Sequence, residues 1–445
     1  MSHKISSWGR AHTYEHDVRP INSAAEIKDF ISSLSEDDGV GLVYGNGRSY
    51  GDSNLNEDGL LLGTGRVDAF LEADWDTGIV KVQSGVTMDV LLQVCVPKGW
   101  FLPVTPGTKF ITIGGAVANN VHGKNHHKVG SFGNFIKSFA LHRSDRKTNP
   151  VICTPKKNKK LFELTIGGLG LSGIIEWVEI QLKPIASSYL YVENKPYASL
   201  REFFELSQDS EDWDYTVAWV DCFAKGDKLG RGIFTRGRFQ DAGALKTHPA
   251  EPKLTWPFVT PSFLLNKPVI KIFNWLYRNR PGAKFCGMSH YDPFFYPLDS
   301  IANWNKLYGK KGFFQHQCII GLDDAETAVT EMLQTIEASG QGSFLAVLKL
   351  HGPETSPGIL SFCTEGLSLA LDFPNRGTKT LALLSALDGI VQTYGGRLYP
   401  AKDGHMSPEL FQTAYPDWDY LEKARDPKLS SSFWRRVTQP IKEQT

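Results

Sequence analysis

Residues 102–134 read LPVTPGTKFITIGGAVANNVHGKNHHKVGSFGN, and this stretch indicates the fold. It contains two polar loops rich in glycine, Pro106–Gly115 and His122–Asn134. Similar loops stand at Gly45–Asp52 (GNGRSYGD) and Gly167–Gly173. Glycine permits positive φ angles and close approach, so that successive backbone N–H groups can converge on an anion. A tight turn between strands would explain any one loop. Four of them in the first part of the chain favour a long diphosphate cofactor lying extended across one domain.

Two shorter motifs suggest other functions, and their context argues against both. Gly168–Gly173 matches GxGxxG, but a helix is expected before it (159–165) and a strand after it (174–182). A Rossmann site needs the opposite order. Gly47–Gly51 matches GxSxG, the nucleophile elbow of serine hydrolases. That motif must lead from a strand into a helix, whereas the continuation DSNLNEDG is typical of a loop, so a hydrolase acting through Ser49 is a distant alternative.

The histidines of HGKNHH raise the question of a metal site. His122 and His126 are four residues apart and would share a face if the segment were helical. However, Gly123 and Asn125 are poor helix formers, and no acidic third ligand stands nearby. We therefore expect no metal here and assign the histidines to orienting a ligand.

The composition limits the class of protein. The 445 residues include 48 Lys plus Arg and 48 Asp plus Glu, a balance that argues against nucleic-acid binding. No apolar run approaches the roughly 18 residues that span a bilayer, and Met1–Arg10 lacks a signal sequence. The six cysteines form no CxxC pair, which fits a reducing compartment. These observations predict a cytoplasmic or peripherally membrane-associated enzyme.

The order of predicted elements indicates an α+β chain of two domains. Helices are expected from a capping box at Ser23 and Glu26, and again from a cap at Thr87. Strands are expected at Gly39–Tyr44, at Ile174–Leu182 and, among alternating aromatic stretches, at 215–223 and 343–350. A late helix ends at Gly395 and Gly396. We expect one domain from residues 1–186 together with 397–445, and a second from residues 187–396.

The segment Leu254–Lys284 is aromatic and basic. It places residues such as Trp256, Phe263 and Trp275 among five lysines and arginines. A core helix flanked by proline turns and an element at a lipid headgroup boundary both fit this composition. The residues themselves leave these two alternatives open.

Taken together, the motifs resemble those of the decaprenylphosphoryl-β-D-ribose 2′-oxidases, FAD-dependent enzymes of the vanillyl-alcohol oxidase superfamily. Besides residues 102–134, the similarity is carried by WGR at Trp8, GNGRSYGD, GGLGLSGII from Gly167, YPLD at Tyr296, GFFQHQ at Gly312, SFLAVLKLHGP at Ser343, DFP at Asp372 and GGRLYPAKD at Gly395. The resemblance implies a PCMH-type FAD-binding domain and a substrate domain built on an antiparallel sheet with helices. It also implies oxidation of the 2′-hydroxyl of a polyprenyl-phosphate-linked ribose to a ketone. A separate NAD(P)H-dependent short-chain reductase would complete the epimerisation to arabinose, and a quinone or oxygen would reoxidise the flavin.

The resemblance also implies roles for individual residues. Those expected to hold FAD are Gly45, Asn46, Gly47, Arg48, Ser49, Tyr50, Gly51, Pro106, Gly107, Thr108, Gly114, Gly115, Asn119, His122, Gly123, Gly173, Ile175 and Tyr399. Those expected at the reacting hydroxyl are Lys402, His122, Tyr50 and Gln315. Those expected to contact substrate are Lys124, Tyr296, Gln317, Lys349, Ser368 and Ala370.

The chain departs from the family pattern at informative positions. Tyr50 stands where many superfamily members carry the histidine that bonds flavin covalently, so non-covalent FAD is expected. Ala370 and Ser368 stand where mycobacterial members have a cysteine, the target of nitroaromatic inhibitors, and an asparagine. An alditol or aldonolactone oxidase that uses oxygen and a free sugar is the main alternative, and a sugar- or lipid-binding protein without flavin is a weaker one.

Overall fold

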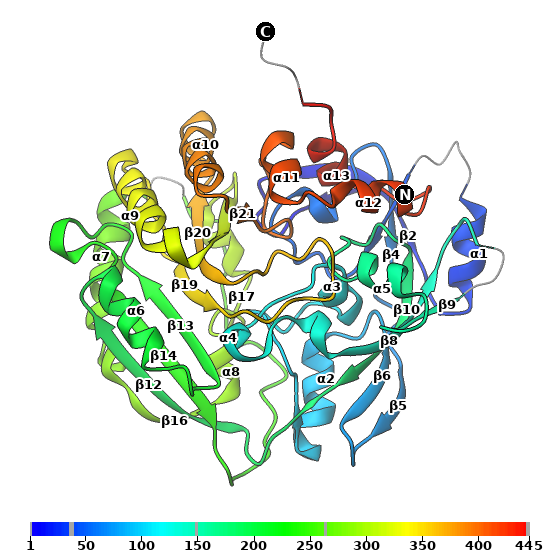
Figure 1. The fold of residues 1–445 in the computed structure, drawn as a ribbon, viewed down its shortest axis with the longest axis horizontal. Coiled ribbons are helices and arrows are strands. Elements are labelled where there is room, and N and C mark those ends of the chain that lie inside the picture. Colours follow the sequence, from blue (N-terminus) through cyan, green and yellow to red (C-terminus); the bar gives the residue numbers. More distant parts are fainter. Residues whose placement is uncertain (1, 35–39, 147–149, 262–264, 442–445) are drawn as a thin grey trace.

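The computed structural model describes residues 2–34, 40–146, 150–261 and 265–441, and it contains helices and mainly antiparallel sheets (Figure 1). The α+β class expected from the sequence is confirmed. The strands before residue 185 form their own sheets. One has the order β1-β2-β4-β3, in which β4 is parallel to both β2 and β3, and another has the order β5-β6-β10-β8-β9. Their bounds are Ser2–Ser6 (β1), Thr13–Pro20 (β2), Gly41–Tyr44 (β3), Leu60–Gly63 (β4), Phe70–Asp74 (β5), Ile79–Gln83 (β6), Ile136–His142 (β8), Val151–Cys153 (β9) and Ile174–Gln181 (β10), with a small pair of Trp100–Phe101 (β7) and Lys183–Pro184 (β11).

The later strands form one eight-stranded antiparallel sheet in the order β16-β12-β14-β13-β19-β20-β18-β21. Their bounds are Tyr189–Tyr197 (β12), Tyr215–Val220 (β13), Gly232–Phe239 (β14), Cys286–His290 (β16), Phe313–Ile320 (β18), Ala346–His351 (β19), Gly366–Pro374 (β20) and Arg397–Leu398 (β21). A parallel pair of Leu254–Thr255 (β15) and Ile301–Ala302 (β17) lies outside it. Because β21 pairs with β18, this sheet extends slightly past the expected boundary at residue 396.

The eight-stranded sheet separates a helix-covered core from a second face of mixed polar and apolar side chains, because successive side chains of a strand point to opposite sides. Leu348, Leu369 and Leu371 are fully buried in the core with the apolar face of helix α9 (Leu322–Ser339). The intervening side chains, such as Lys349, Ala370 and Gln317, lie on the opposite face. The helices that cover the core side of the sheet are α6 (Leu200–Gln208), α9 (Leu322–Ser339) and α10 (Thr378–Thr393).

The end of the chain folds back onto its beginning. Helices α11 (Pro408–Ala414), α12 (Trp418–Ala424) and α13 (Ser432–Val437) lie over the N-terminal strands, red over blue in Figure 1. Gly41 and Leu429 form a β-bridge there. Arg436 pairs with both Asp52 and Asp403, at 2.7 and 2.9 Å. These contacts hold the loop that carries Lys402 against the loop that follows β3.

Most of the short-range expectations are confirmed in the remaining helices, α1 (Glu26–Ser33), α2 (Met88–Cys95), α3 (Ile113–Ala118), α4 (His126–Val129), α5 (Lys159–Thr165) and α8 (Tyr291–Phe295). Thr87 caps α2 by accepting from Val90 N, and α5 precedes the Gly168 loop while β10 follows it. The capping box at Ser23 is wrong: Ala25 stands at the N-cap position of α1 and makes no side-chain cap hydrogen bond, and the Glu26 carboxylate accepts from Asn22 N instead. Gly39, expected to start a strand, lies outside the described residues.

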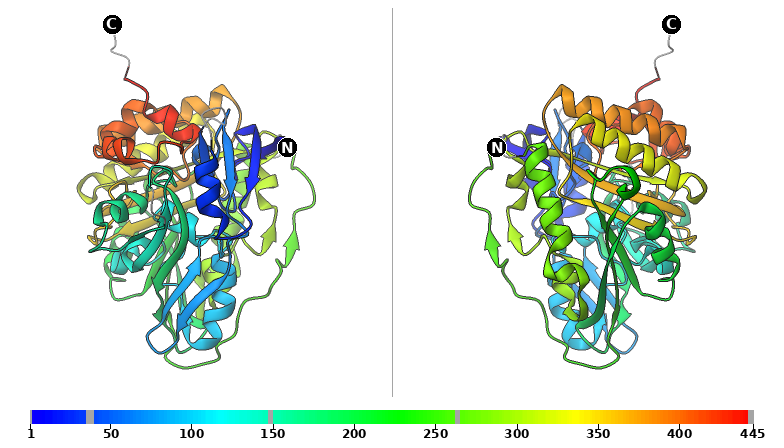
Figure 2. Two further views of the ribbon diagram at one scale, coloured as in Figure 1. Left: turned by 90° about the vertical axis from the view of Figure 1, so that its right-hand side faces the viewer. Right: turned by 90° about the vertical axis from the view of Figure 1, so that its left-hand side faces the viewer.

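The aromatic and basic segment is not a core helix. Helix α7 (Lys267–Asn279) runs along the outside of the molecule, lime green in Figure 2. In it only Ile270 and Asn274 are buried, while Ile272 and Trp275 are each 60% exposed. Its neighbours Phe263 and Leu264 lie outside the described residues. No helix in the described part of the chain is long and apolar enough to cross a bilayer.

Candidate active site

A cavity of about 1080 Å³ lies between the glycine-rich loops and the face of the eight-stranded sheet that carries Gln317 and Lys349. One wall comes from the loops after β3, around Pro106 and at the start of α3. The opposite wall comes from alternate residues of β12, β13, β14, β18, β19 and β20. Residues far apart in sequence therefore face one another across it.

The glycine loops have the geometry that close approach to a ligand requires. Gly47 has φ +59°, where an L side chain is strained, and a Cβ there would meet the Tyr44 hydroxyl. Thr112 caps α3 by accepting from Gly115 N at 3.1 Å, and Asn46 Nδ2 donates to Phe110 O at 2.8 Å, which ties the two loops together. By contrast, a Cβ on Gly107 would meet no atom within 4 Å, so space remains beside this backbone.

Lys402 lies on the cavity wall in an unusual environment. Its Nζ is 3.6 Å from the centre of the Tyr50 ring, and burial lowers the pKa of its amine to about 7 against the opposing effect of Asp372. Asp372 accepts from Gln315 Nε2 at 2.5 Å and from the Tyr308 hydroxyl at 3.2 Å. Burial raises the pKa of the Asp372 carboxyl to about 7. This side chain can therefore titrate near neutral pH, as can the Lys402 amine.

A second polar cluster surrounds His122. Gln317 Nε2 lies 2.9 Å from His122 Nε2, and Lys349 Nζ lies 3.2 Å from His122 Nδ1. Burial and the neighbouring lysine lower the pKa of the His122 imidazole, which keeps it neutral. Burial also lowers the pKa of Lys349 to about 8 and that of Lys124 to about 7. Within the described residues, no carboxylate forms an ion pair with Lys124 or Lys349.

The structure brings together most of the residues singled out from the sequence. Those on the cavity wall are Gly45, Asn46, Gly47, Arg48, Ser49, Tyr50, Pro106, Gly107, Thr108, Gly114, Gly115, Asn119, His122, Gly123, Lys124, Gly173, Ile175, Gln315, Gln317, Lys349, Ala370, Tyr399 and Lys402. Three others are not on the wall. The backbone of Gly51 packs against Asp403, Tyr296 lies behind Thr105 and shares a hydrogen bond of 2.6 Å with it, and Ser368 is buried in β20.

Sequence reasoning missed two parts of this site. Asp372 was recognised only as part of a motif, although its position on β20 opposite Gln315 explains its contact with that residue. Tyr308 gave no signal, because it comes from the 3₁₀ helix Trp304–Tyr308, outside any recognised motif.

The serine-hydrolase alternative finds no support in the geometry. Strand β3 leads into a three-residue 3₁₀ turn, Asp52–Asn54, and not into an α-helix. Among the described residues, no imidazole is hydrogen-bonded to the Ser49 hydroxyl. The nucleophile elbow requires both features.

Comparison with known proteins identifies the kind of site. A sequence model described as "FAD binding domain" matches residues 18–145. The chain is 33% identical to a decaprenylphosphoryl-β-D-ribose oxidase of Mycolicibacterium smegmatis over 98% of this chain and 97% of that one. It is 30% identical to an uncharacterized protein of Streptomyces coelicolor, over 79% of this chain and 100% of the relative. A human Δ(24)-sterol reductase is 26% identical over 50% of this chain and 40% of its own.

The residues present fit FAD. Five buried polar atoms on the loop side of the cavity have no hydrogen-bond partner among the described residues: Arg48 Nε, Ser53 Oγ, Asn54 Nδ2 and Oδ1, and Ser84 Oγ. Buried polar groups normally find partners, so unpaired atoms beside an open cavity indicate a polar ligand. The free space at Gly107 lies on the same wall.

Proposed function

Because the chain belongs to the family of the decaprenylphosphoryl-β-D-ribose oxidases and is thus an FAD-dependent oxidoreductase, we propose that it oxidises the 2′-hydroxyl of a polyprenyl-phosphate-linked ribose to a ketone. The observation that supports this most is the position of the Lys402 amine. It lies in the same cavity as the glycine loops, and its pKa is about 7. Bound FAD would be the two-electron oxidant, which accepts a hydride from the carbinol carbon.

Lys402 is suited to accept the hydroxyl proton. A general base works best when its pKa lies near the working pH, and burial brings the lysine amine into that range. The Tyr50 ring limits the positions open to the amine, and the negative charge of Asp372 favours the protonated form that results. Gln315, hydrogen-bonded to Asp372, completes this wall.

Lys124 and Lys349 are suited to bind the substrate phosphate. Lys349 lowers the pKa of Lys124 by repulsion, and neither has a carboxylate partner among the described residues. An anion placed between two such amines would relieve that repulsion and restore their charge. His122 and Gln317, which contact each other beside Lys349, would then orient the ribose hydroxyls.

The cofactor would be held without a covalent bond, with the diphosphate against the backbone N–H groups of Gly45–Gly51. Residues 1–186 with 397–445 would form the PCMH-type FAD-binding domain, and residues 187–396 would form the substrate domain. A quinone or oxygen would reoxidise the flavin, and a separate NAD(P)H-dependent short-chain reductase would convert the ketone to the arabinose form.

Helix α7 supports a lipid-linked substrate. Its residues Val269, Phe273 and Tyr277 line the cavity, while Ile272, Trp275 and Leu276 of the same helix are exposed. Lys271 of the same helix and Lys284 of the 3₁₀ turn that follows it are also exposed. Apolar and cationic side chains in this arrangement suit the headgroup region of an anionic bilayer, so we infer peripheral membrane contact here.

The test is anaerobic mixing of the flavin-loaded protein with farnesylphosphoryl-β-D-ribose, a short-chain substrate. We expect loss of the oxidised-flavin absorbance and one equivalent of a 2′-ketone, which borohydride converts to a ribose–arabinose mixture. Reduction by a free alditol but not by the phosphoribose would instead favour the alditol oxidase. A protein that holds flavin but is reduced by neither compound would contradict the proposal.

A further inference from the structure

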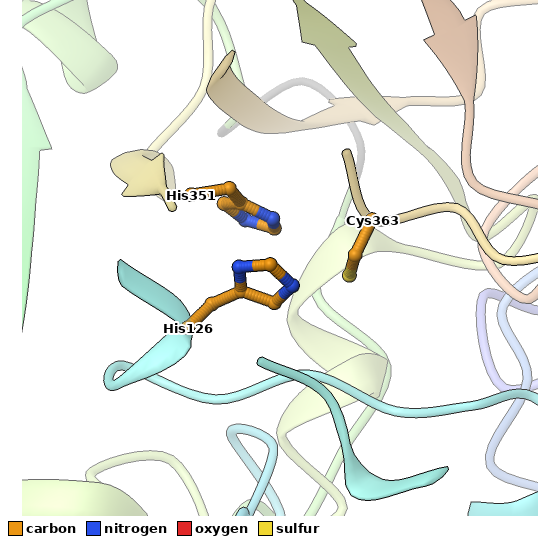
Figure 3. Close-up of side chains that lie close together, drawn as sticks. All are labelled: His126, His351 and Cys363. Atoms are coloured by element: carbon orange, nitrogen blue, oxygen red, sulfur yellow. The ribbon is translucent and has the colours of Figure 1, made fainter. Parts of the chain in front are cut away.

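Behind His122 and outside the cavity wall, three side chains of types that can bind a metal ion lie close together. They are His126 from α4, His351 from the end of β19, and Cys363 from the loop before β20. Their exposed fractions are 1%, 2% and 5%, and their donor atoms all lie within 4.8 Å of one another. Figure 3 shows the two imidazoles stacked, with a ring nitrogen of each turned toward the sulfur of Cys363.

The two imidazoles lack the hydrogen bonds that buried histidines need. All four of their ring nitrogens are buried, and none has a hydrogen-bond partner in the part of the chain that the structure describes. A neutral imidazole has one N–H donor and one lone pair, and leaving either unpaired in the interior is unfavourable. Other buried histidines behave differently. His16, His142 and His248 each bond a backbone amide, a carboxylate or a hydroxyl.

Because the two rings are stacked, their nitrogens do not hydrogen-bond to each other. Their centroids are 4.3 Å apart with an interplanar angle of 26°, so the nitrogens of one ring do not point at those of the other. An ion placed between the nitrogens at the edges of both rings would also be within reach of the Cys363 sulfur. Two imidazoles and a thiolate form a donor set that suits thiophilic d10 ions, and no carboxylate is among them.

We propose that His126, His351 and Cys363 bind one thiophilic d10 cation, Cu⁺ or Zn²⁺, through two imidazole nitrogens and a thiolate. Metal–ligand bonds of about 2.0–2.3 Å require the donor atoms to move closer by about 1 Å, which small side-chain rotations provide. Burial raises the pKa of the Cys363 thiol, and the nearby Lys349 and Arg397 only partly oppose this rise, so a bound ion would have to displace the thiol proton.

The site would fix the wall behind the reacting groups. The His351 ring lies 4.9 Å from that of His122, so a bound ion would hold His351, and through it His122, in one position. The site takes no part in the proposed oxidation, and its test needs no substrate.

The test measures metal bound to the flavin-loaded protein after chelator treatment. Cu⁺ is added anaerobically in competition with bicinchoninate, Zn²⁺ is added to a second sample, and each is quantified by mass spectrometry after gel filtration. We expect one equivalent of at least one ion. Cys363→Ser should lower its affinity at least tenfold, whereas Cys153→Ser, at another buried free cysteine, should not.

Co²⁺ supplies an independent readout, because a thiolate bound to Co²⁺ gives a charge-transfer band in the near ultraviolet. This band should be present in the wild type and in Cys153→Ser, and absent in Cys363→Ser. His351→Gln provides a second variant should Cys363→Ser lose its flavin and fail to fold. Less than a tenth of an equivalent of either ion in the wild type, or equal retention by the ligand variants, would overturn the proposal.

Discussion

The side-chain nitrogen of Lys402 lies 3.6 Å from the centre of the Tyr50 ring. The backbone supports the same contact, because Tyr50 N donates to Ala401 O at 3.0 Å. Two segments from opposite ends of the chain are thereby held as one unit. Tyr50 thus positions Lys402, the proposed base.

Replacing Lys402 with alanine should separate chemistry from cofactor binding. We expect Lys402→Ala to keep bound FAD but to lose about 10²–10⁴-fold in the rate of flavin reduction by substrate, the usual contribution of a positioned base. Anaerobic stopped-flow absorbance measures this rate, with the exposed Lys98→Ala as the control. Reduction at the wild-type rate would rule out this role for Lys402.

The rate of flavin reduction should depend on pH through the Lys402 amine. With its pKa lowered to about 7, the amine is protonated and inactive as a base at lower pH, so the rate should fall about tenfold per unit below that value and level off above about pH 8.

Asp372→Asn tests this assignment. Asp372 raises the pKa of Lys402, so its removal should move the midpoint of the rate profile to lower pH. A midpoint that stays in place or rises would assign the titration to another group.

The flavin should be released by acid. Precipitation of the flavin-loaded protein should leave the yellow colour in the supernatant, because Tyr50 offers no imidazole for a covalent bond. Gly107→Leu should fill the open space on the cavity wall and lower FAD occupancy, whereas Gly389→Leu, at an exposed position of helix α10, should not. Colour that stays in the pellet would contradict non-covalent binding.

A cysteine introduced at residue 370 should make the protein sensitive to covalent nitroaromatic inhibitors. Ala370 lines the cavity, whereas five of the six natural cysteines are buried and Cys286 is exposed outside it. Turnover with a nitroaromatic inhibitor should leave the wild type active and inactivate Ala370→Cys, with one adduct visible in the intact mass. Equal inactivation of both proteins would show that residue 370 is not the target.

Helix α7 should carry the membrane contact. The wild type should sediment with vesicles containing 30% phosphatidylglycerol, and Ile272→Ser combined with Trp275→Ser should reduce the bound fraction several-fold because both side chains are exposed and apolar. Leu381→Ser, an exposed leucine on α10, is the matched control. Equal binding by all three proteins would exclude α7 as the contact.

The sequence alone was enough for most features that depend on neighbouring residues, although the cap expected at Ser23 was wrong. Thr87 could be identified as a cap, and the order of helix, glycine loop and strand around Gly168 ruled out a Rossmann site, because capping and strand propensity act over a few positions. The glycine loops and the family motifs indicated the cofactor in the same way.

Contacts between distant segments were decided only by tertiary packing. The pattern of α7 fitted a core helix as well as an exposed one, because periodicity does not say what covers an apolar face. HGKNHH offered no third metal-binding side chain locally, yet the pairing of β19 with β20 places His351 near the loop that carries Cys363, and both side chains lie close to His126. Lys402 reaches Tyr50 because ion pairs of Arg436 close the chain on itself. Such long-range contacts follow from how whole elements pack, which no local stretch of sequence encodes.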